Sequence, residues 1–356
     1  MLLLPTMLLA CADKGADSAG PVDLVAELTA PGPYPVGYRE SVVAYPDPAD
    51  SSATRSLRLA VWYPAAAEEG GEAHYLSGAI PAEGVYDAPA AIAGPLPVAV
   101  FSHGHQGYAE NSGFLMEHLA SHGWVVAAPD HTGNTTFDGG DRETSIYYQR
   151  PADITAVLDA LLAGEVDGVP SVSEPAGLMG HSFGGYTSYS LAGGVYDPAV
   201  LAACLDGSDT SSFCATMTAD DAARFAGGLG DDRFAATVAM ASGDFDLFGA
   251  DGLQALSGPV LHMTGSLDTG SDDPYWAAIA GQGNLRVTLE GGGHQTFTDY
   301  SGILESMDGL IDADVGFRII DAYALAWLRW GVLGDDSVLP VLDGTLEIDA
   351  AAVLSR

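Results

Sequence analysis

Lysine is almost missing from this sequence of 356 residues: of the twelve basic residues, Lys14 is the one lysine, and the others are arginine. Acidic residues number 48, and the formal net charge is −36 at pH 7. A field of this sign repels phosphate backbones, so we expect no nucleic-acid partner. Cysteine is also scarce, with three residues, which excludes a small disulfide-stapled scaffold. Hydrophobic residues make up 47% of the chain, which excludes a disordered protein.

The N-terminal residues 1–10 read MLLLPTMLLA, a run too short to span a bilayer, which requires about 20 apolar residues. Such a run is typical of the apolar region of an export signal. The residues from Leu8 to Cys11 resemble a bacterial lipobox, in which the signal is removed before a lipidated cysteine. We therefore predict a lipoprotein-type signal peptide at 1–10, lipidation of Cys11 and a flexible tether at 11–30. No basic residue precedes the run, so an apolar N-terminus without a sorting role stays an alternative.

The other two cysteines, Cys204 and Cys214, lie in a stretch rich in Gly, Asp and Ser. An exported chain reaches an oxidising space, whether as an outer-membrane or cell-surface lipoprotein or as a secreted protein. We therefore predict a disulfide between these two residues. The alternative is a pair of buried thiols, which is the expectation for a cytosolic protein.

The chain alternates between short apolar runs and segments with helical spacing. Strand-like runs lie at 41–45, 56–63, 97–102, 124–128, 176–180, 235–241, 259–264 and, as the last strand, 286–289. Helical spacing between them, for example at 153–162, predicts right-handed crossovers and an α/β fold with a mostly parallel sheet flanked by helices. We expect one domain at 31–335, a small helical cap insertion at about 195–233 and a C-terminal tail at 336–356. Residues 64–95, rich in Gly, Ala and Pro, are expected to be irregular.

The sequence Gly180-His181-Ser182-Phe183-Gly184 matches the motif G-x-S-x-G, directly after an apolar run and before a helical segment. In this context the motif is a nucleophile elbow. The two glycines make room for a sharp turn that exposes the hydroxyl at a helix N-terminus, where the helix dipole favours negative charge. The alternative is an ordinary serine in a glycine-rich turn. We predict Ser182 as the nucleophile of an acyl-transfer reaction.

A serine nucleophile requires a general base, which follows it in the order Ser, acid, His. Beyond Ser182 the sequence has two histidines, His262 and His294. His262 lies inside a predicted strand, where its side chain is expected to pack in the sheet. His294 follows Gly291-Gly292-Gly293 in the loop after the last predicted strand, so we predict His294 as the base.

The acid that orients the base is expected at the C-terminal end of the preceding strand. Asp268 stands there, in Gly265-Ser266-Leu267-Asp268. Asp272 and Asp273 are close competitors and are expected to be solvated loop acids, although either could exchange roles with Asp268. We predict Asp268 as the third member of the triad.

An acyl-transfer site also requires donors for the oxyanion. We predict the backbone amides of Phe183, directly after the nucleophile, and of His105, in the loop after the run 97–102. His103 and His105 are two residues apart on this loop and have no matching cysteine or carboxylate set. A zinc site is therefore not expected, and no metal is predicted.

These motifs together resemble the α/β-hydrolase superfamily. Within it the chain is similar to bacterial dienelactone-hydrolase-like and platelet-activating-factor-acetylhydrolase-like esterases, which neighbour the cutinase-like polyester hydrolases. The resemblance runs from about Val36 to Asp335 and rests on VFSHG at 100–104, APDHTGNT at 128–135, GHSFGG at 180–185, GSLD at 265–268 and GH at 293–294. It implies a serine-ester mechanism that needs no cofactor.

Two departures limit the resemblance. Dienelactone hydrolases use a cysteine nucleophile, whereas this chain has Ser182. The animal acetylhydrolases place their acid after the strand equivalent to 235–241, where no aspartate aligns, although Asp244 and Asp246 are close. We therefore keep Asp268 as the acid and do not infer a phospholipid substrate.

The sequence predicts a serine-dependent carboxylic ester hydrolase that acts through an acyl-enzyme on short to medium acyl or polyester-type esters. A lipase or phospholipase A2-like enzyme and a peptidase on the same fold are the alternatives within the enzyme class. A non-catalytic surface-binding protein is the alternative outside it. The expected partners are a small-molecule or polymeric ester and a membrane reached through a lipid on Cys11, and the expected state is a monomer.

Overall fold

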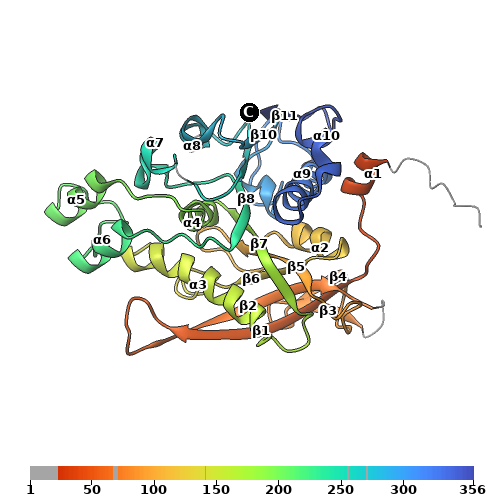
Figure 1. Cartoon of the computed structure of the whole chain (residues 1–356), viewed down its shortest axis with the longest axis horizontal. Coiled ribbons are helices and arrows are strands. Elements are labelled where there is room, and N and C mark those ends of the chain that lie inside the picture. Colours follow the sequence, from red (N-terminus) through yellow and green to blue (C-terminus); the bar gives the residue numbers. More distant parts are fainter. Residues whose placement is uncertain (1–22, 67–70, 141, 255, 270–271) are drawn as a thin grey trace, which may run out of the picture.

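The structure is a computed structural model, and it describes residues 23–66, 71–140, 142–254, 256–269 and 272–356, with the backbone alone at 272–273. The predicted signal peptide at 1–10, Cys11 and the part of the predicted tether at 11–22 lie outside the described residues. The described chain forms one sheet with helices on both faces (Figure 1).

The sheet has eleven strands in the order β11-β10-β9-β8-β7-β5-β6-β2-β1-β4-β3. Their bounds are β1 Val36–Pro46, β2 Thr54–Pro64, β3 Glu72–Tyr75, β4 Ile80–Tyr86, β5 Leu96–Ser102, β6 Val125–Pro129, β7 Val172–His181, β8 Phe234–Met240, β9 Val260–Gly265, β10 Leu285–Leu289 and β11 Ala352–Ser355. The central strands β6, β5, β7, β8, β9 and β10 run parallel, and β1, β2, β3 and β11 add antiparallel pairs at the two sides. The predicted α/β class with a mostly parallel sheet is confirmed.

Helices cover both faces of the central strands. Their bounds are α1 Leu24–Thr29, α2 Gly113–Ser121, α3 Thr144–Leu162, α4 Phe183–Leu191, α5 Pro198–Asp206, α6 Ala219–Ala226, α7 Gly249–Gly252, α8 Asp272–Ile279, α9 Ala313–Leu333 and α10 Leu339–Leu342, with short 3-10 helices at Phe245–Leu247, His294–Phe297 and Asp336–Val338. The helices α2 and α9 pack on one face of the sheet, and α3 and α4 pack on the other.

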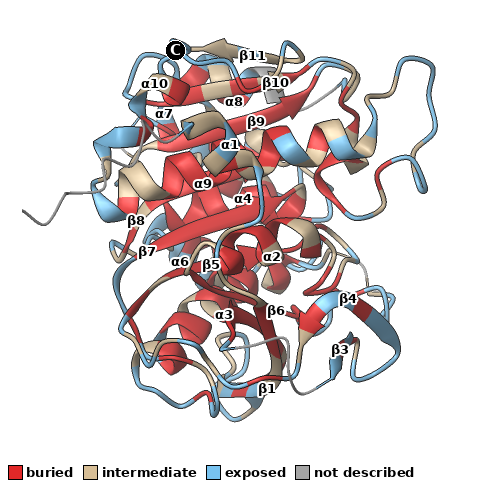
Figure 2. Ribbon diagram, turned by 90° about the vertical axis from the view of Figure 1, so that its right-hand side faces the viewer, coloured by how far each residue is buried: buried red, intermediate tan, exposed pale blue. Residues whose placement is uncertain are grey.

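The central strands are buried on both faces, as Figure 2 shows. In β5, Ala99 and Phe101 belong to the core under α2 and α9, whereas Val98 and Val100 belong to the core under α3. A strand that is apolar on both faces has no alternation of polar and apolar residues. This is why these strands read in the sequence as continuous apolar runs.

The predicted insertion at 195–233 contains two helices with local start and stop signals. Asp197 accepts a hydrogen bond from Ala199 N at the start of α5, and Gly207 ends that helix in the left-handed region. Thr218 and Asp221 form a capping box at the start of α6. Between the two helices, Cys204 and Cys214 form the predicted disulfide, with Cα atoms 4.7 Å apart.

Both ends of the described chain are more ordered than predicted. The helix α1 falls within the predicted tether, but it packs against α9 and buries Leu28 completely, so the tether prediction is wrong for residues 24–29. The predicted C-terminal tail at 336–356 contains α10 and β11. The strand β11 pairs antiparallel with β10, and Val341 and Leu342 are buried. These segments are too short for a periodic pattern, and tertiary contacts hold them in place: α1 packs against α9, and β11 pairs with β10 (Figure 1).

The stretch 64–95 is not irregular throughout, which corrects the sequence-based expectation. It contains β3 and β4, which pair antiparallel, and β4 extends the sheet by pairing parallel with β1. Exposed and buried residues alternate in β3, and β4 is mostly exposed (Figure 2). Among the described residues, no helix is long and apolar enough to cross a membrane.

Candidate active site

Ser182 stands at the turn between β7 and α4, with a φ of 57° and a ψ of −117°. A non-glycine residue adopts this conformation only at an energetic cost, which the surrounding structure must offset. The flanking glycines make the turn possible. A Cβ on Gly180 would lie 2.1 Å from the carbonyl oxygen of Gly184, and a Cβ on Gly184 would lie 1.8 Å from that of Ser102. The turn therefore has the geometry of a nucleophile elbow.

The structure brings together the three predicted triad residues from the ends of three parallel strands. Ser182 follows β7, Asp268 follows β9 and His294 follows β10. His294 Nε2 lies 2.9 Å from Ser182 Oγ, and His294 Nδ1 lies 2.8 Å from Asp268 Oδ2. The side chains of His294 and Asp268 are 33% and 17% exposed, so the site is open to a ligand. This chain of hydrogen bonds can move a proton from the serine hydroxyl to the imidazole.

The other candidates for the base and the acid are His262, Asp244, Asp272 and Asp273. The first two bind other partners, and the side chains of the last two are not described. His262 is buried in β9, where its Nδ1 lies 2.9 Å from the Tyr189 hydroxyl. Asp244 binds Arg142 with both carboxylate oxygens, at 2.8 and 3.0 Å. The side chains of Asp272 and Asp273 lie outside the described residues.

The main chain of His294 is held on both sides by residues that the sequence analysis did not identify. Its amide donates to Glu305 Oε1 at 3.1 Å, and the amide of Gln295 donates to Glu305 Oε2 at 2.8 Å. Its carbonyl oxygen accepts from His181 Nε2 at 2.9 Å. Burial lowers the pKa of His181 to about 3, so this imidazole stays neutral at neutral pH. Glu305 carried no sequence signal, because it lies in a segment without a motif or a periodic pattern.

The two predicted oxyanion donors also approach the nucleophile. Phe183 is the first residue of α4, and His105 lies in the loop after β5. A Cβ on the neighbouring Gly104 would lie 3.3 Å from Ser182 Cβ, so this loop passes directly beside the nucleophile. Within the described residues, neither the amide of Phe183 nor that of His105 has a hydrogen-bond acceptor. Both N–H groups are therefore free to bind an oxyanion.

A second arrangement of Ser, His and Asp lies buried behind this loop. Ser102 Oγ lies 2.9 Å from His131 Nε2, and His131 Nδ1 lies 2.8 Å from Asp153 Oδ2. All three residues are completely buried, so no substrate can reach them. Arg55 donates to both oxygens of Asp153, at 2.6 and 2.9 Å. The network is structural, and its Ser102 and His131 lie in the VFSHG and APDHTGNT segments noted in the sequence.

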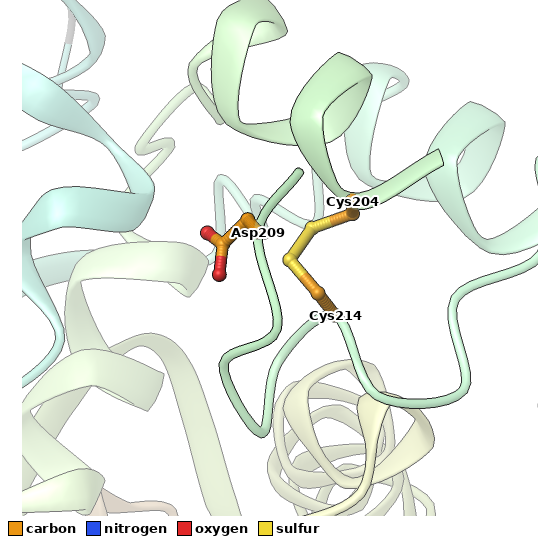
Figure 3. A group of neighbouring side chains, drawn as sticks. All are labelled: Cys204, Asp209 and Cys214. Carbon is orange, nitrogen blue, oxygen red and sulfur yellow. A yellow bond between two sulfur atoms is a disulfide. The ribbon is translucent and has the colours of Figure 1, made fainter. Parts of the chain in front are cut away.

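The histidines of the oxyanion loop do not form a metal pair. His103 is buried, with its Nδ1 2.7 Å from the carbonyl oxygen of Gly104, and His105 Nδ1 lies 2.9 Å from Asn134 Nδ2. Among the described residues, the one group with ligand atoms close enough to hold a metal is Cys204, Asp209 and Cys214. Figure 3 shows that its two sulfur atoms are bonded to each other, so they cannot act as thiolate ligands.

Comparisons with known proteins agree with the architecture. The model of the chlorophyllase family, an α/β-hydrolase family, matches residues 78–213. No curated protein matches the chain in sequence. The structure of a ferulic acid esterase from Streptomyces cinnamoneus is similar, with 20% sequence identity and a TM-score of 0.65 over 92% of this chain and 99% of that chain. A shared fold does not by itself assign a substrate. The chain therefore has an α/β-hydrolase-like fold.

Proposed function

We propose that this protein is a serine-dependent carboxylic ester hydrolase. Ser182 attacks the ester carbonyl while His294 takes the hydroxyl proton, and the amides of Phe183 and His105 bind the oxyanion. His294 then gives the proton to the leaving alcohol, which departs and leaves an acyl-enzyme. Water, activated by His294, attacks the acyl-enzyme and releases the carboxylic acid and free Ser182. Asp268 orients the imidazole and stabilises its cationic form throughout.

One observation carries the proposal. The hydrogen-bonded chain from Ser182 through His294 to Asp268 lies in a partly exposed place, beside two backbone amides that have no other acceptor among the described residues. The buried arrangement of Ser102, His131 and Asp153 has similar distances but no access. The chlorophyllase-family match and the ferulic acid esterase likeness support ester hydrolysis over peptide hydrolysis.

The proposal is tested with p-nitrophenyl acetate and butyrate. We expect the substitution Ser182→Ala to reduce kcat by about 10⁴-fold or more, because removal of a triad member abolishes the acyl-enzyme route. A fluorophosphonate probe should label the wild-type protein on Ser182, as mass spectrometry of the labelled peptide would reveal.

The matched control is Ser190→Ala, which removes a buried serine hydroxyl from the same helix, α4. Ser190 Oγ bonds the Tyr196 hydroxyl and lies away from the triad. We expect this variant to keep wild-type kcat. Equal activity of Ser182→Ala and wild type would refute the assignment, and a wild type that neither turns over esters nor reacts with the probe would instead indicate a non-catalytic scaffold.

The substrate class is proposed as short to medium acyl or polyester-type esters. A panel of p-nitrophenyl esters of graded chain length, methyl ferulate, a triglyceride emulsion, a phospholipid and a polyester film would separate the esterase from the lipase and phospholipase alternatives. A peptide substrate would test the peptidase. The largest kcat/KM on emulsions or peptides would contradict the proposed class.

We also propose that the protein works outside the cytoplasm. The disulfide between Cys204 and Cys214 supports this location, since disulfides persist in oxidising compartments. Expression of the full chain in a bacterium, with Cys11→Ala as the control, would test whether a lipid on Cys11 carries it to the membrane fraction. A wild-type protein found only in the cytoplasm would contradict the proposal.

A further inference from the structure

The two oxyanion donors belong to different elements, and one buried side chain contacts both of these elements. Phe183 begins α4, whereas His105 lies in the loop after β5. Arg150 extends from α3 into the space between them and is completely buried. Among the described residues, its guanidinium donates hydrogen bonds only to uncharged groups, which is an unusual environment for a buried cation.

On the loop side, Arg150 holds the segment that carries His105. It donates to the carbonyl oxygen of His103 and, at 3.1 Å, to Ser102 Oγ. Its second terminal nitrogen donates to Asn134 Oδ1 at 2.8 Å, and Asn134 Nδ2 donates to His105 Nδ1 at 2.9 Å. Arg150 therefore fixes the loop both directly, through a carbonyl, and indirectly, through the His105 ring.

On the helix side, Arg150 holds the start of α4. Its Nε donates to Thr187 Oγ1 at 3.2 Å, one turn after the nucleophile. Its guanidinium carbon lies 4.6 Å from the centre of the Phe183 ring, within the range of a cation–π contact. The same side chain thus contacts the residue that carries the first donor and the loop that carries the second.

The charge of Arg150 also matters for the site. Among the described residues, no carboxylate forms an ion pair with Arg150, because Arg55, Tyr45 and His131 occupy the nearby Asp153 carboxylate. Burial lowers the pKa of Arg150 to about 9, so the guanidinium is still protonated at neutral pH. A cation without a directly paired anion produces a positive potential at the groups it contacts, here the His103 carbonyl and the Phe183 ring, and this effect is strong in a buried site.

We propose that Arg150 is the positioning residue of the oxyanion hole: it aligns the amides of Phe183 and His105 and favours the negative charge of the tetrahedral intermediate. The inference rests on the proposed ester hydrolase function. An interaction that strengthens as the oxyanion forms raises kcat and leaves ground-state binding almost unchanged. A role in folding alone would change the amount of active protein and would not change the affinity of the folded protein for an oxyanion mimic.

The experiment compares Arg150→Met, Arg150→Lys and Asn134→Ala in the full chain, at equal concentrations of folded protein. We expect Arg150→Met to lower kcat for p-nitrophenyl butyrate by about 10²- to 10³-fold, the loss that follows removal of one oxyanion donor, with KM within about threefold of wild type. The affinity for a trifluoromethyl ketone, which forms a tetrahedral oxyanion on Ser182, should fall by a similar factor. Arg150→Lys, which keeps the charge, and Asn134→Ala, which removes only the His105 link, should lose about 10-fold each.

Arg55→Met is the matched control, because Arg55 is also a buried arginine next to Asp153 but contacts neither donor. It should lower thermal stability and change kcat by no more than a few-fold. Equal loss of kcat in Arg55→Met and Arg150→Met, or unchanged ketone affinity in Arg150→Met, would overturn the inference. If Arg150→Met does not fold, kcat and ketone affinity are measured on Arg150→Lys and Asn134→Ala instead. Wild-type values of both quantities in these two variants would overturn the inference. A wild type without esterase activity or fluorophosphonate labelling would refute the proposed function itself, which is a separate outcome.

Discussion

His294 begins a short 3-10 helix in the connection after β10 and shows how such a residue acquires the precision that the proposed acyl transfer requires. Its ring is oriented by Asp268, its amide is bound by Glu305 and its carbonyl oxygen is bound by His181. A loop on its own allows many orientations, and a displacement of about 1 Å can cost two orders of magnitude in rate. Three contacts from three different segments remove this freedom. The triad geometry is therefore a property of the residues around His294 as well as of the triad.

The acid assignment leads to a prediction at the residue scale. We expect Asp268→Ala to lower kcat/KM for p-nitrophenyl butyrate by roughly 10³- to 10⁴-fold, because the imidazole loses the group that sets its tautomer and stabilises its cation. Asp272→Ala tests the competitor that the sequence left open and should retain activity close to wild type. A larger loss in Asp272→Ala than in Asp268→Ala would move the acid to that position.

At the scale of elements, α3 continues through a proline. Pro151 has no N–H and cannot donate to the carbonyl oxygen of Tyr147, four residues earlier. The Tyr186 hydroxyl, from α4, donates to that carbonyl at 2.8 Å instead. The helix thus continues across Pro151 and runs from Thr144 to Leu162. The sequence analysis had identified helical spacing at 153–162. The hydrogen bond from Tyr186 also joins α3, which carries Arg150, to the helix that begins at the nucleophile.

The hydrogen bond from the Tyr186 hydroxyl to the Tyr147 carbonyl predicts that substitutions at Tyr186 and Pro151 have non-additive effects on the free energy of unfolding. We expect Tyr186→Phe to lower the free energy of unfolding by about 1–3 kcal/mol, because a buried carbonyl is left without a donor. Pro151→Ala restores a backbone N–H at that position. In a double-mutant cycle followed by urea denaturation, Tyr186→Phe should therefore cost less in the Pro151→Ala background. The same cost in both backgrounds would show that the hydroxyl does not replace the missing donor.

At the scale of the whole molecule, acidic residues outnumber basic ones by 48 to 12. Most arginines are already used in ion pairs among the described residues. The pairs are Arg39–Asp87, Arg55–Asp153, Arg58 with Glu40, Glu110 and Asp130, Arg142–Asp244, Arg233 with Asp159 and Asp231, Arg318–Asp349, and Arg329 with Glu27 and Asp335. Many exposed carboxylates therefore repel one another in the folded state.

This charge imbalance predicts that salt stabilises the fold. The Debye length falls from about 30 Å at 0.01 M salt to about 8 Å at 0.15 M, so repulsion between exposed carboxylates weakens. We expect Tm, measured by circular dichroism, to rise between 0.01 and 0.3 M NaCl and then to level off. A variant with Asp232→Asn, Asp251→Asn and Asp308→Asn, all at exposed positions, should show a smaller rise. A Tm that falls with salt would mean that the ion pairs outweigh the repulsion.

The succession of strands and helices along the core could be read from the residues alone, because strands buried on both faces leave continuous apolar runs. The sequence also located the nucleophile turn, since the close approaches at Gly180 and Gly184 exclude any side chain there. Asp268 and His294 followed from chain order, and the structure brings both to Ser182. Cys204 and Cys214 followed from spacing, and the disulfide is confirmed.

The support of the site by Arg150, Asn134, His181 and Glu305 became visible in the folded structure and could not be predicted from the sequence. Arg150 and Ser102 are 48 residues apart, and His181 and His294 are 113 apart. Contacts of this kind leave no periodicity and no local motif, because each depends on where the sheet places the ends of its strands. The same reason explains α1 and β11, whose short segments have too little local preference to hold a structure without α9 and β10 beside them.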